Sequence, residues 1–180
     1  MARFLSYLSS LGVAKPEDIS HRMVAAFYRD DDHACYKSKD VCNNYVRKFL
    51  RYLSDRAIIK ASISLALDKF VLPRLVYIDE LTGNARETFQ SSGNSTLCAE
   101  AFHEKTLEMN AILDQHMYSK SVKKSFRIAW RELFIFLEAN SLHYSVETAL
   151  AWATYMRNYT VQWKSFRRAV MLFEQFRASS

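Results

Sequence analysis

The sequence predicts an all-α protein made of two small helical bundle units joined by a polar linker. Only three glycines and two prolines occur among its 180 residues, so helices should rarely be interrupted. Apolar side chains recur at steps of three and four along most of the chain, which is the spacing of one face of an α-helix. A hydrophobic content of 49% indicates a packed core rather than a disordered chain.

The first predicted unit covers residues 1–81 and opens directly inside a helix, so we expect it to lack a leading helix. Gly12 can end that first helix as a C-terminal cap. Pro16 and the acids after it suit the first turn of the next helix. Helices are expected over residues 1–12 and 16–28, from about residue 38 onward, and from residue 58 toward a strap that Pro73 ends. On the third helix, the predicted inward face carries Val41, Tyr45, Phe49, Leu50 and Leu53.

Residues 82–98 are rich in Gly, Asn, Ser and Thr and form the predicted linker. The second unit, residues 99–180, is predicted to contain four helices. They are expected over residues 99–117, 118–137, 146–156 and 161–176.

The helix over residues 118–137 has two contrasting faces. Ser119 or Ser121 is a suitable N-cap, and residues 139–141 a suitable stop. Cations near the start of a helix oppose its dipole, so helix stability alone does not select them. The apolar face carries Val122, Phe126, Ala129, Trp130, Leu133, Phe134 and Leu137, and the remaining surface carries Lys120, Lys123, Lys124, Arg127 and Arg131.

Two blocks of the first unit align with two blocks of the second unit, which predicts an internal repeat. The block that begins at Arg3 aligns with the block that begins at Glu132. The block from Val41 aligns with the block from Val161. This second alignment pairs Arg47 with Arg167 and Lys48 with Arg168.

Positive charge is concentrated in three helical segments. Residues 37–53 and 119–137 each carry a net charge of +4, and residues 161–177 carry +3, against +6 for the whole chain. The remainder is therefore net acidic. Clustered cations of this kind are typical of a surface that follows the phosphates of nucleic acid, and we predict double-stranded DNA as the partner. The alternative is an α-helical scaffold that binds protein, with the cations merely solvated.

No motif for catalysis or cofactor binding was found, so no enzymatic activity, cofactor or small-molecule substrate is expected. The chain contains no Gly-rich phosphate loop, HExxH or GxSxG motif. His33, Cys35 and Cys42 do not have the spacing of a complete zinc site. We predict a soluble cytoplasmic protein. The number of cysteines is odd, no signal peptide pattern occurs, and no apolar stretch is long enough to span a membrane.

Most aromatic residues of the second unit are predicted to be core residues, because they lie on apolar helix faces. Trp163 is the exception, since it stands beside Lys164 in the first turn of the last helix. Its role as a core residue or as a platform for base stacking stays open. The predicted core residues are Phe126, Trp130, Phe134, Trp152 and Phe173.

Three segments of the second unit resemble the core-binding domain of tyrosine recombinases, the phage-integrase family. These segments are YSKSVKKSFRIAWRELFIFLEANSL, YSVETALAWATYM and TVQWKSFRRAVMLFEQF. The first unit resembles the same domain through GVAKPEDIS, SKDVCNNYVRKFLRYLSDRAII and the LPRL strap. The resemblance implies SAM-like four-helix domains that close over duplex DNA, with the second and fourth helices against the major groove.

The resemblance also implies which residues contact DNA. Asn43 and Asn44 are expected to read base edges, where Asn pairs well with adenine, and most of the cations to contact phosphates. The implied residues are Lys120, Lys123, Lys124, Arg127, Lys164, Arg167 and Arg168 in the second unit, and Asn43, Asn44, Arg47 and Lys48 in the first.

One departure from the family limits what the chain is expected to do. The catalytic domain of tyrosine recombinases uses a His-x-x-Arg motif, and no such motif occurs here. The expected role is therefore a non-catalytic, DNA-binding portion of a site-specific recombinase, acting in DNA integration or recombination. Other recombinase protomers are further expected partners.

Overall fold

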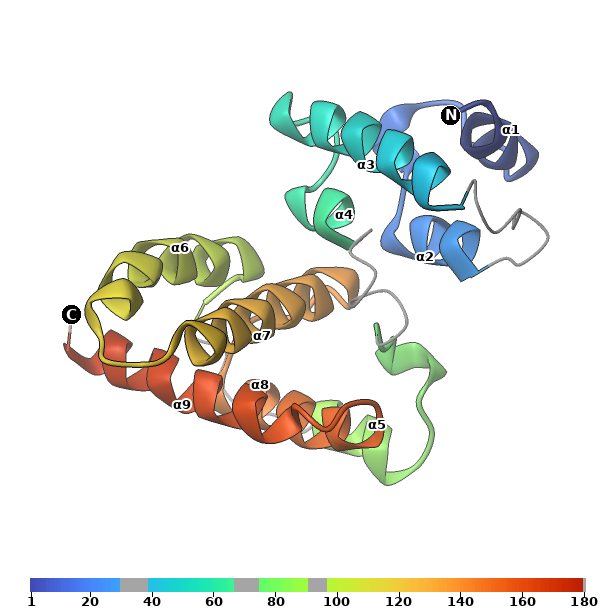
Figure 1. The fold of residues 1–180 in the computed structure, drawn as a ribbon. Coiled ribbons are helices and arrows are strands. Elements are labelled where there is room, and N and C mark those ends of the chain that lie inside the picture. The colour runs from blue at the N-terminus through green and yellow to red at the C-terminus, as the bar shows by residue number, and fades with distance from the viewer. Residues whose placement is uncertain (30–38, 67–74, 91–96, 180) are drawn as a thin grey trace. The chain divides into compact units, whose positions relative to one another are not determined.

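The computed structural model describes residues 1–29, 39–66, 75–90 and 97–179. The structure is 76% helical, and its described residues contain no strand, which confirms the all-α prediction. Leu97 and Tyr144 form an isolated antiparallel β-bridge. The chain divides into two compact units, Met1–Leu75 and Val76–Ser180 (Figure 1).

The first unit is a small bundle around an apolar core. Its helices are α1 (Ala2–Ser10), α2 (His21–Arg29), α3 (Lys39–Asp55) and α4 (Ala61–Ala66). Phe4 and Phe27 pack edge to face with their ring centroids 5.0 Å apart. Val24, Val46 and Leu50 are buried beside them in the same core. Aliphatic and aromatic side chains from short helices thus supply most of this unit's stabilising burial. The proposed strap at Pro73 lies outside the described residues.

The helix predicted over residues 16–28 is broken into two elements. Pro16–Asp18 forms a single 3-10 turn, and Ile19 is extended with ψ 122°. The side-chain oxygen of Ser20 then accepts a hydrogen bond from Met23 N at 3.3 Å. Ser20 therefore acts as an N-cap within the predicted helix, and α2 begins only after it.

The inward face of α3 differs from the predicted one. Val46, Leu50 and Leu53 are buried, whereas Tyr45 is 55% exposed. Phe49 is half-buried. The prediction that Tyr45 points inward was therefore wrong, because its neighbour Val46 lies on the core side of the helix with Leu50 and Leu53. The side chain of Val41 lies outside the described set.

The second unit contains five α-helices in its described part. They are α5 (Asn84–Gln90), α6 (Ala99–Gln115), α7 (Lys120–Ala139), α8 (Val146–Tyr155) and α9 (Trp163–Ser179), with short 3-10 turns η4 (Ile78–Glu80) and η5 (Met156–Asn158). The long helix α7 packs between α6 and α9, and α8 packs against α9 (Figure 1). The four helices predicted over residues 99–176 match α6 to α9 to within a few residues.

The division between the units lies earlier than the sequence indicated. We predicted a first unit of residues 1–81 and a linker of residues 82–98, but the structure assigns everything after Leu75 to the second unit. Helix α5 lies inside the predicted linker, and its Phe89 is buried 5.3 Å from the ring of Phe136. One buried aromatic in a polar stretch is enough to dock this segment.

Helix α7 has the capping and the core face that the sequence predicts. Ser119 is the N-cap, and its hydroxyl accepts a hydrogen bond from Val122 N at 3.4 Å. The helix ends at Asn140, inside the predicted stop. The indole Nε1 of Trp130 donates to Ala169 O at 2.9 Å and so connects α7 to α9. The five aromatic residues predicted to be core, Phe126, Trp130, Phe134, Trp152 and Phe173, are all buried.

Candidate nucleic-acid interface

Helix α9 turns one apolar face into the second unit and one basic face outward. Phe166, Val170 and Phe173 are buried at steps of three and four. Three cations within two positions of Phe166, namely Lys164, Arg167 and Arg168, are exposed. We call these three the α9 cations. The side chains that anchor the helix and those that could meet a ligand are therefore separated by helical periodicity.

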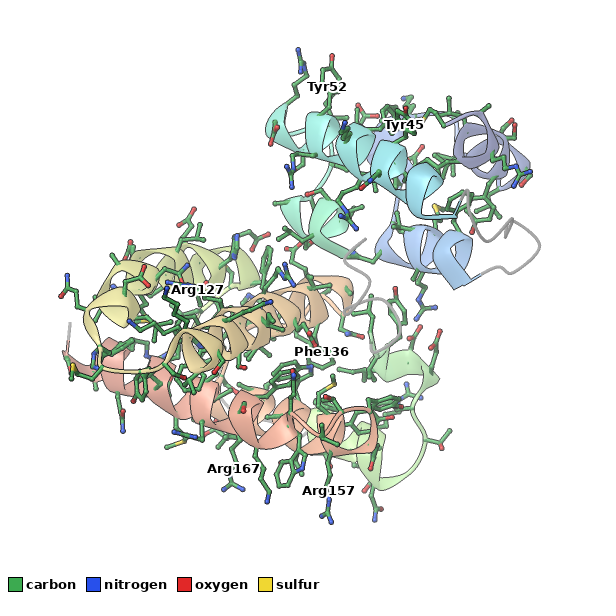
Figure 2. The ribbon with its side chains drawn as sticks, viewed as in Figure 1. Tyr45, Tyr52, Arg127, Phe136, Arg157 and Arg167 are labelled. Carbon is green, nitrogen blue, oxygen red and sulfur yellow. The ribbon has the colours of Figure 1, made fainter. Side chains whose placement is uncertain are left out.

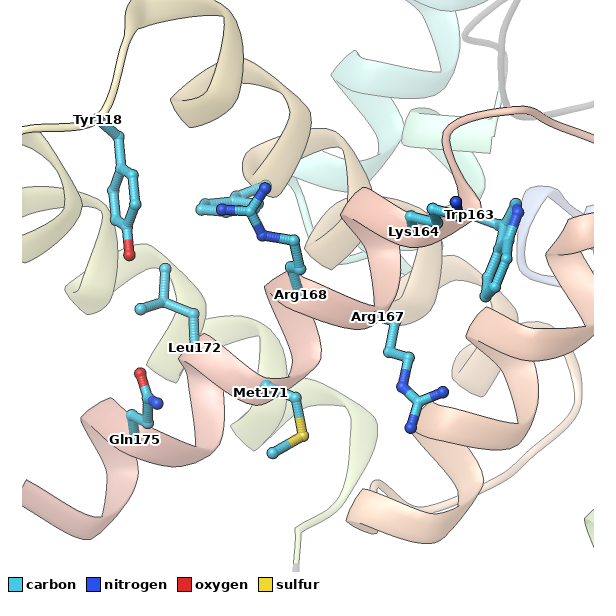
Figure 3. A pocket seen from close by; sticks show the side chains of 9 residues that line it. Tyr118, Trp163, Lys164, Arg167, Arg168, Met171, Leu172 and Gln175 are labelled. Carbon is cyan, nitrogen blue, oxygen red and sulfur yellow. The ribbon is translucent and has the colours of Figure 1, made fainter.

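A groove of about 520 Å³ runs along this outward face of α9. Its polar side is formed by the α9 cations, and its apolar side by Tyr118, Phe126 and Leu172. Figure 3 shows Tyr118 across the groove from Arg168. The groove therefore offers cations along one edge and an apolar floor, and it is open enough to admit an extended ligand.

The α9 cations have no neutralising partner among the described residues. None of them forms an ion pair or a hydrogen bond with any residue that the structure describes. All three lie in the first half of a 17-residue helix, where the helix dipole is positive. Positive charge at this position is unfavourable for the isolated helix, and an anionic ligand would offset it.

Trp163 stands among cations rather than in the core. Its side chain is half-buried. Lys164 Nζ lies 5.9 Å from the centre of its ring, and the guanidinium carbon of Arg157 lies 5.8 Å from it. Both distances are within the range of a cation–π contact. Trp163 thus draws two cations toward the start of α9.

Arg157 is a candidate that sequence reasoning missed. It lies in η5, outside any amphipathic pattern, and the turn brings it back toward the first residue of α9. The local signal that could have revealed it is an exposed arginine within two helical turns of a tryptophan and a lysine. With Arg157, four cations surround the start of α9.

Two predicted contact residues of α7 are instead engaged with α6. Arg127 forms an ion pair with Asp114 at 2.6 Å and donates to Asn110 Oδ1 at 3.2 Å. Lys123 Nζ donates to Asp114 O at 2.7 Å. Figure 2 shows Arg127 between α6 and α7, whereas Arg157 and Arg167 project from the opposite side of α9. The structure therefore does not bring all the predicted cations of this unit to one surface.

The remaining predicted residues have mixed environments. Lys120 and Lys124 are exposed near the start of α7. In the first unit, Asn44 and Lys48 are exposed on α3, whereas Arg47 is half-buried and already engaged. The side chain of Asn43 lies outside the described set.

The described residues hold no group of three or more His, Cys, Asp or Glu side chains that could bind a metal ion. Cys98 is an exposed free thiol. His33, Cys35 and the side chain of Cys42 fall outside the described residues. Among the helices of the described part, none is both long and apolar enough to span a membrane.

One buried pair has the residue types of a nucleophile and its base. His21 Nε2 lies 2.7 Å from Ser62 Oγ. Both side chains are buried, at 7% and 0% exposure, so a substrate cannot reach them. Burial, followed by the positive charge of Lys60, lowers the pKa of His21 to about 4. The pair is therefore a structural hydrogen bond of the first unit.

The chain has no match among protein-family models, curated proteins or solved structures.

Proposed function

We propose that the second unit binds duplex DNA through the outward face of α9. The observation that carries this proposal is the set of three α9 cations, which have no ion-pair or hydrogen-bond partner among the described residues and lie in the first half of the helix, where its dipole is positive. Phosphates neutralise such a surface and release counterions, which supplies affinity. Arg157 extends the same charge beyond the start of the helix.

The width of a single α-helix matches the major groove of B-DNA, which suits an exposed helix face of this length. Lysine and arginine contacts to phosphates position a protein but carry little sequence information. We therefore propose that contacts to the phosphate backbone of DNA come from Lys164, Arg167 and Arg168. In the same proposal Lys123 and Arg127 hold α7 against α6 and contribute little to binding.

A salt titration tests the proposal. Fluorescence anisotropy measures the affinity for a labelled duplex between about 50 and 300 mM salt, where each phosphate contact contributes about 0.9 to the slope of log K against log salt. The variant R167Q/R168Q should bind more weakly, with a slope that is smaller by about two. The matched control K105Q/R177Q removes the same charge at ion-paired positions and should keep the wild-type slope.

A second variant separates the two sets of cations. K123Q/R127Q removes two charges that face α6, and we expect its duplex affinity to stay within about threefold of wild type. Equal losses in all three variants would indicate a response to net charge alone. No measurable duplex binding by the wild-type chain would contradict the proposal and favour the protein-binding scaffold.

The biological context we propose is site-specific recombination. This part of the proposal rests on the resemblance to the core-binding domain of tyrosine recombinases, with the chain acting as a non-catalytic DNA-binding portion beside other protomers. Two protomers related by a two-fold axis would contact two half-sites, so selection from a random duplex pool should enrich inverted repeats. Enrichment of no sequence at all, despite salt-dependent binding, would contradict the recombination role and leave the duplex binding intact.

A further inference from the structure

Helix α3 presents two tyrosines to solvent on the face opposite its core residues. Tyr45 is 55% exposed and Tyr52 is 51% exposed. Figure 2 shows both side chains projecting outward from α3. Lys48 lies between them in the helical period, because steps of three and four keep residues on one face. Lys48 and Arg51 are exposed as well. We call this surface, Tyr45, Lys48, Arg51 and Tyr52, the α3 tyrosine face.

We propose that the α3 tyrosine face binds single-stranded nucleic acid. Bases stack on the rings of Tyr45 and Tyr52, and Lys48 and Arg51 contact the phosphates between them. This site lies in the first unit and its ligand differs from the duplex assigned to α9. The inference therefore does not depend on the proposed function.

The two tyrosines are not needed for the core of their own unit. Val46, Leu50 and Leu53 fill the inward side of α3 and are nearly or fully buried. Two large rings that stay about half exposed contribute little to the free energy of folding, because only the apolar surface that is buried stabilises the packing of a helix on its core. Their exposure thus leaves stacking surface available to a ligand.

The ring of Tyr52 is already oriented. The guanidinium carbon of Arg56 lies 3.9 Å from the centre of this ring, a close cation–π contact. With this contact in place, Tyr52 is still 51% exposed, so ring surface remains for a base. Tyr45 and Tyr52 are seven residues apart, about 10 Å along the helix axis, so they would receive two different bases of one strand.

Charge and ring chemistry together favour a single strand over the other anionic partners. Lys48 and Arg51 of α3, together with Arg56 directly after the helix, outnumber Asp55, the acid at its end. This excess of positive charge indicates a polyanion. Bases in a duplex are already stacked on each other, whereas unpaired bases can stack on an aromatic side chain. An acidic peptide would satisfy the cations and leave both rings without a stacking partner.

The test uses the full chain and a labelled oligothymidine of about 20 nucleotides, because this sequence has no secondary structure of its own. Y45A/Y52A should lower the affinity by about thirtyfold or more, as expected from the loss of two stacked bases. Y45F/Y52F keeps both rings and should stay within about twofold. An abasic oligonucleotide of the same length should bind the wild-type chain more weakly than oligothymidine.

Three results would overturn the inference. The first is oligothymidine affinity that is unchanged in Y45A/Y52A, and the second is equal binding of the abasic strand. The third is displacement of oligothymidine by polyglutamate of matched charge, which would make this an acidic-polypeptide surface. Circular dichroism checks that each variant is folded. R167Q/R168Q and Y45A/Y52A serve as reciprocal controls. R167Q/R168Q should keep the wild-type affinity for oligothymidine, and Y45A/Y52A should keep the wild-type affinity for the duplex.

Discussion

At the scale of single residues, His21 is held neutral by the fold of the first unit. Its ring lies beside Ser62 and is 7% exposed. Burial and then the charge of Lys60 lower its pKa from 6.5 to about 4. The unfolded chain therefore binds a proton between these values that the folded chain does not bind. The neutral His21 therefore stabilises the folded unit relative to the unfolded chain. This stabilisation is complete above pH 6.5 and is lost as the pH falls toward 4.

We predict that the first unit loses about 2 kcal/mol of stability between about pH 7.5 and pH 5 because of His21. Amide hydrogen exchange in α2 and α4 measures the free energy of opening at each pH. H21Q cannot titrate, so its pH dependence should be smaller by that amount. Carboxylates contribute equally to both proteins. An identical pH dependence in wild type and H21Q would show that His21 is protonated without cost in the folded unit.

Residue-scale predictions from the sequence succeeded where a helix face is broad and apolar. The predicted face of α7 is buried from Phe126 to Leu137, and only Val122 at its start is half-buried. On α3 and α6 the inward and outward sides are closer in hydrophobicity. Tyr45 was expected on the inward face of α3, but it is 55% exposed and Val46 is buried instead. On α6, Leu107 is likewise 55% exposed and Met109 is buried.

The partners of charged residues could not be predicted from the sequence. Periodicity places Arg127 on the same helical face as other cations, but it cannot show that Asp114 of the preceding helix lies 2.6 Å away. The same limit applies to Arg157, whose position depends on the turn η5. The partner of a cation depends on how neighbouring helices pack, and the periodicity of one helix does not predict that packing.

At the scale of elements, the C-terminus of α7 holds the start of the second unit in place. Asn140 Oδ1 accepts a hydrogen bond from Ile78 N at 2.8 Å, and Asn140 Nδ2 donates to Val76 O at 2.9 Å. The same amide donates to Phe136 O at 2.9 Å. A single cap residue thus links residues 76–78 to a helix that begins more than forty residues later.

We predict that N140A destabilises the second unit by about 2–3 kcal/mol, because three hydrogen bonds are lost and two backbone groups are left without a partner. Urea unfolding followed by tryptophan fluorescence measures the loss. Hydrogen exchange of residues 76–90 should accelerate more than exchange in α9. N158A changes an exposed asparagine in η5 and is the matched control. A loss no larger than that of N158A would contradict this anchoring role.

The order and type of the long helices could be predicted, because each has a sustained apolar period. The two elements that differ are short. The helix α5 has seven residues with one buried ring, Phe89, so its period is too brief to recognise. The turn at Pro16–Asp18 ends because Ser20 caps a new helix. A serine side chain can either cap a new helix or lie within a continuous one, and the sequence pattern does not distinguish these two conformations.

At the scale of the whole molecule, the chain consists of two units that differ in their chemistry. All three tryptophans, Trp130, Trp152 and Trp163, belong to the second unit. The proposed duplex surface lies on α9 of this unit, and the α3 tyrosine face lies on the first. The internal repeat that pairs Arg47 with Arg167 stays a prediction. The two residues differ in exposure, since Arg47 on α3 is half-buried and Arg167 on α9 is exposed.

Each unit has its own buried core, so we predict that residues 76–180 fold and bind duplex DNA without residues 1–75. Tryptophan fluorescence reports only on the second unit, which permits a direct comparison between the fragment and the full chain. The urea midpoints should coincide, and the duplex affinities should agree within about threefold. A lower midpoint in the fragment would mean that the first unit stabilises the second. An unchanged midpoint with lost duplex affinity would place part of the duplex surface on the first unit.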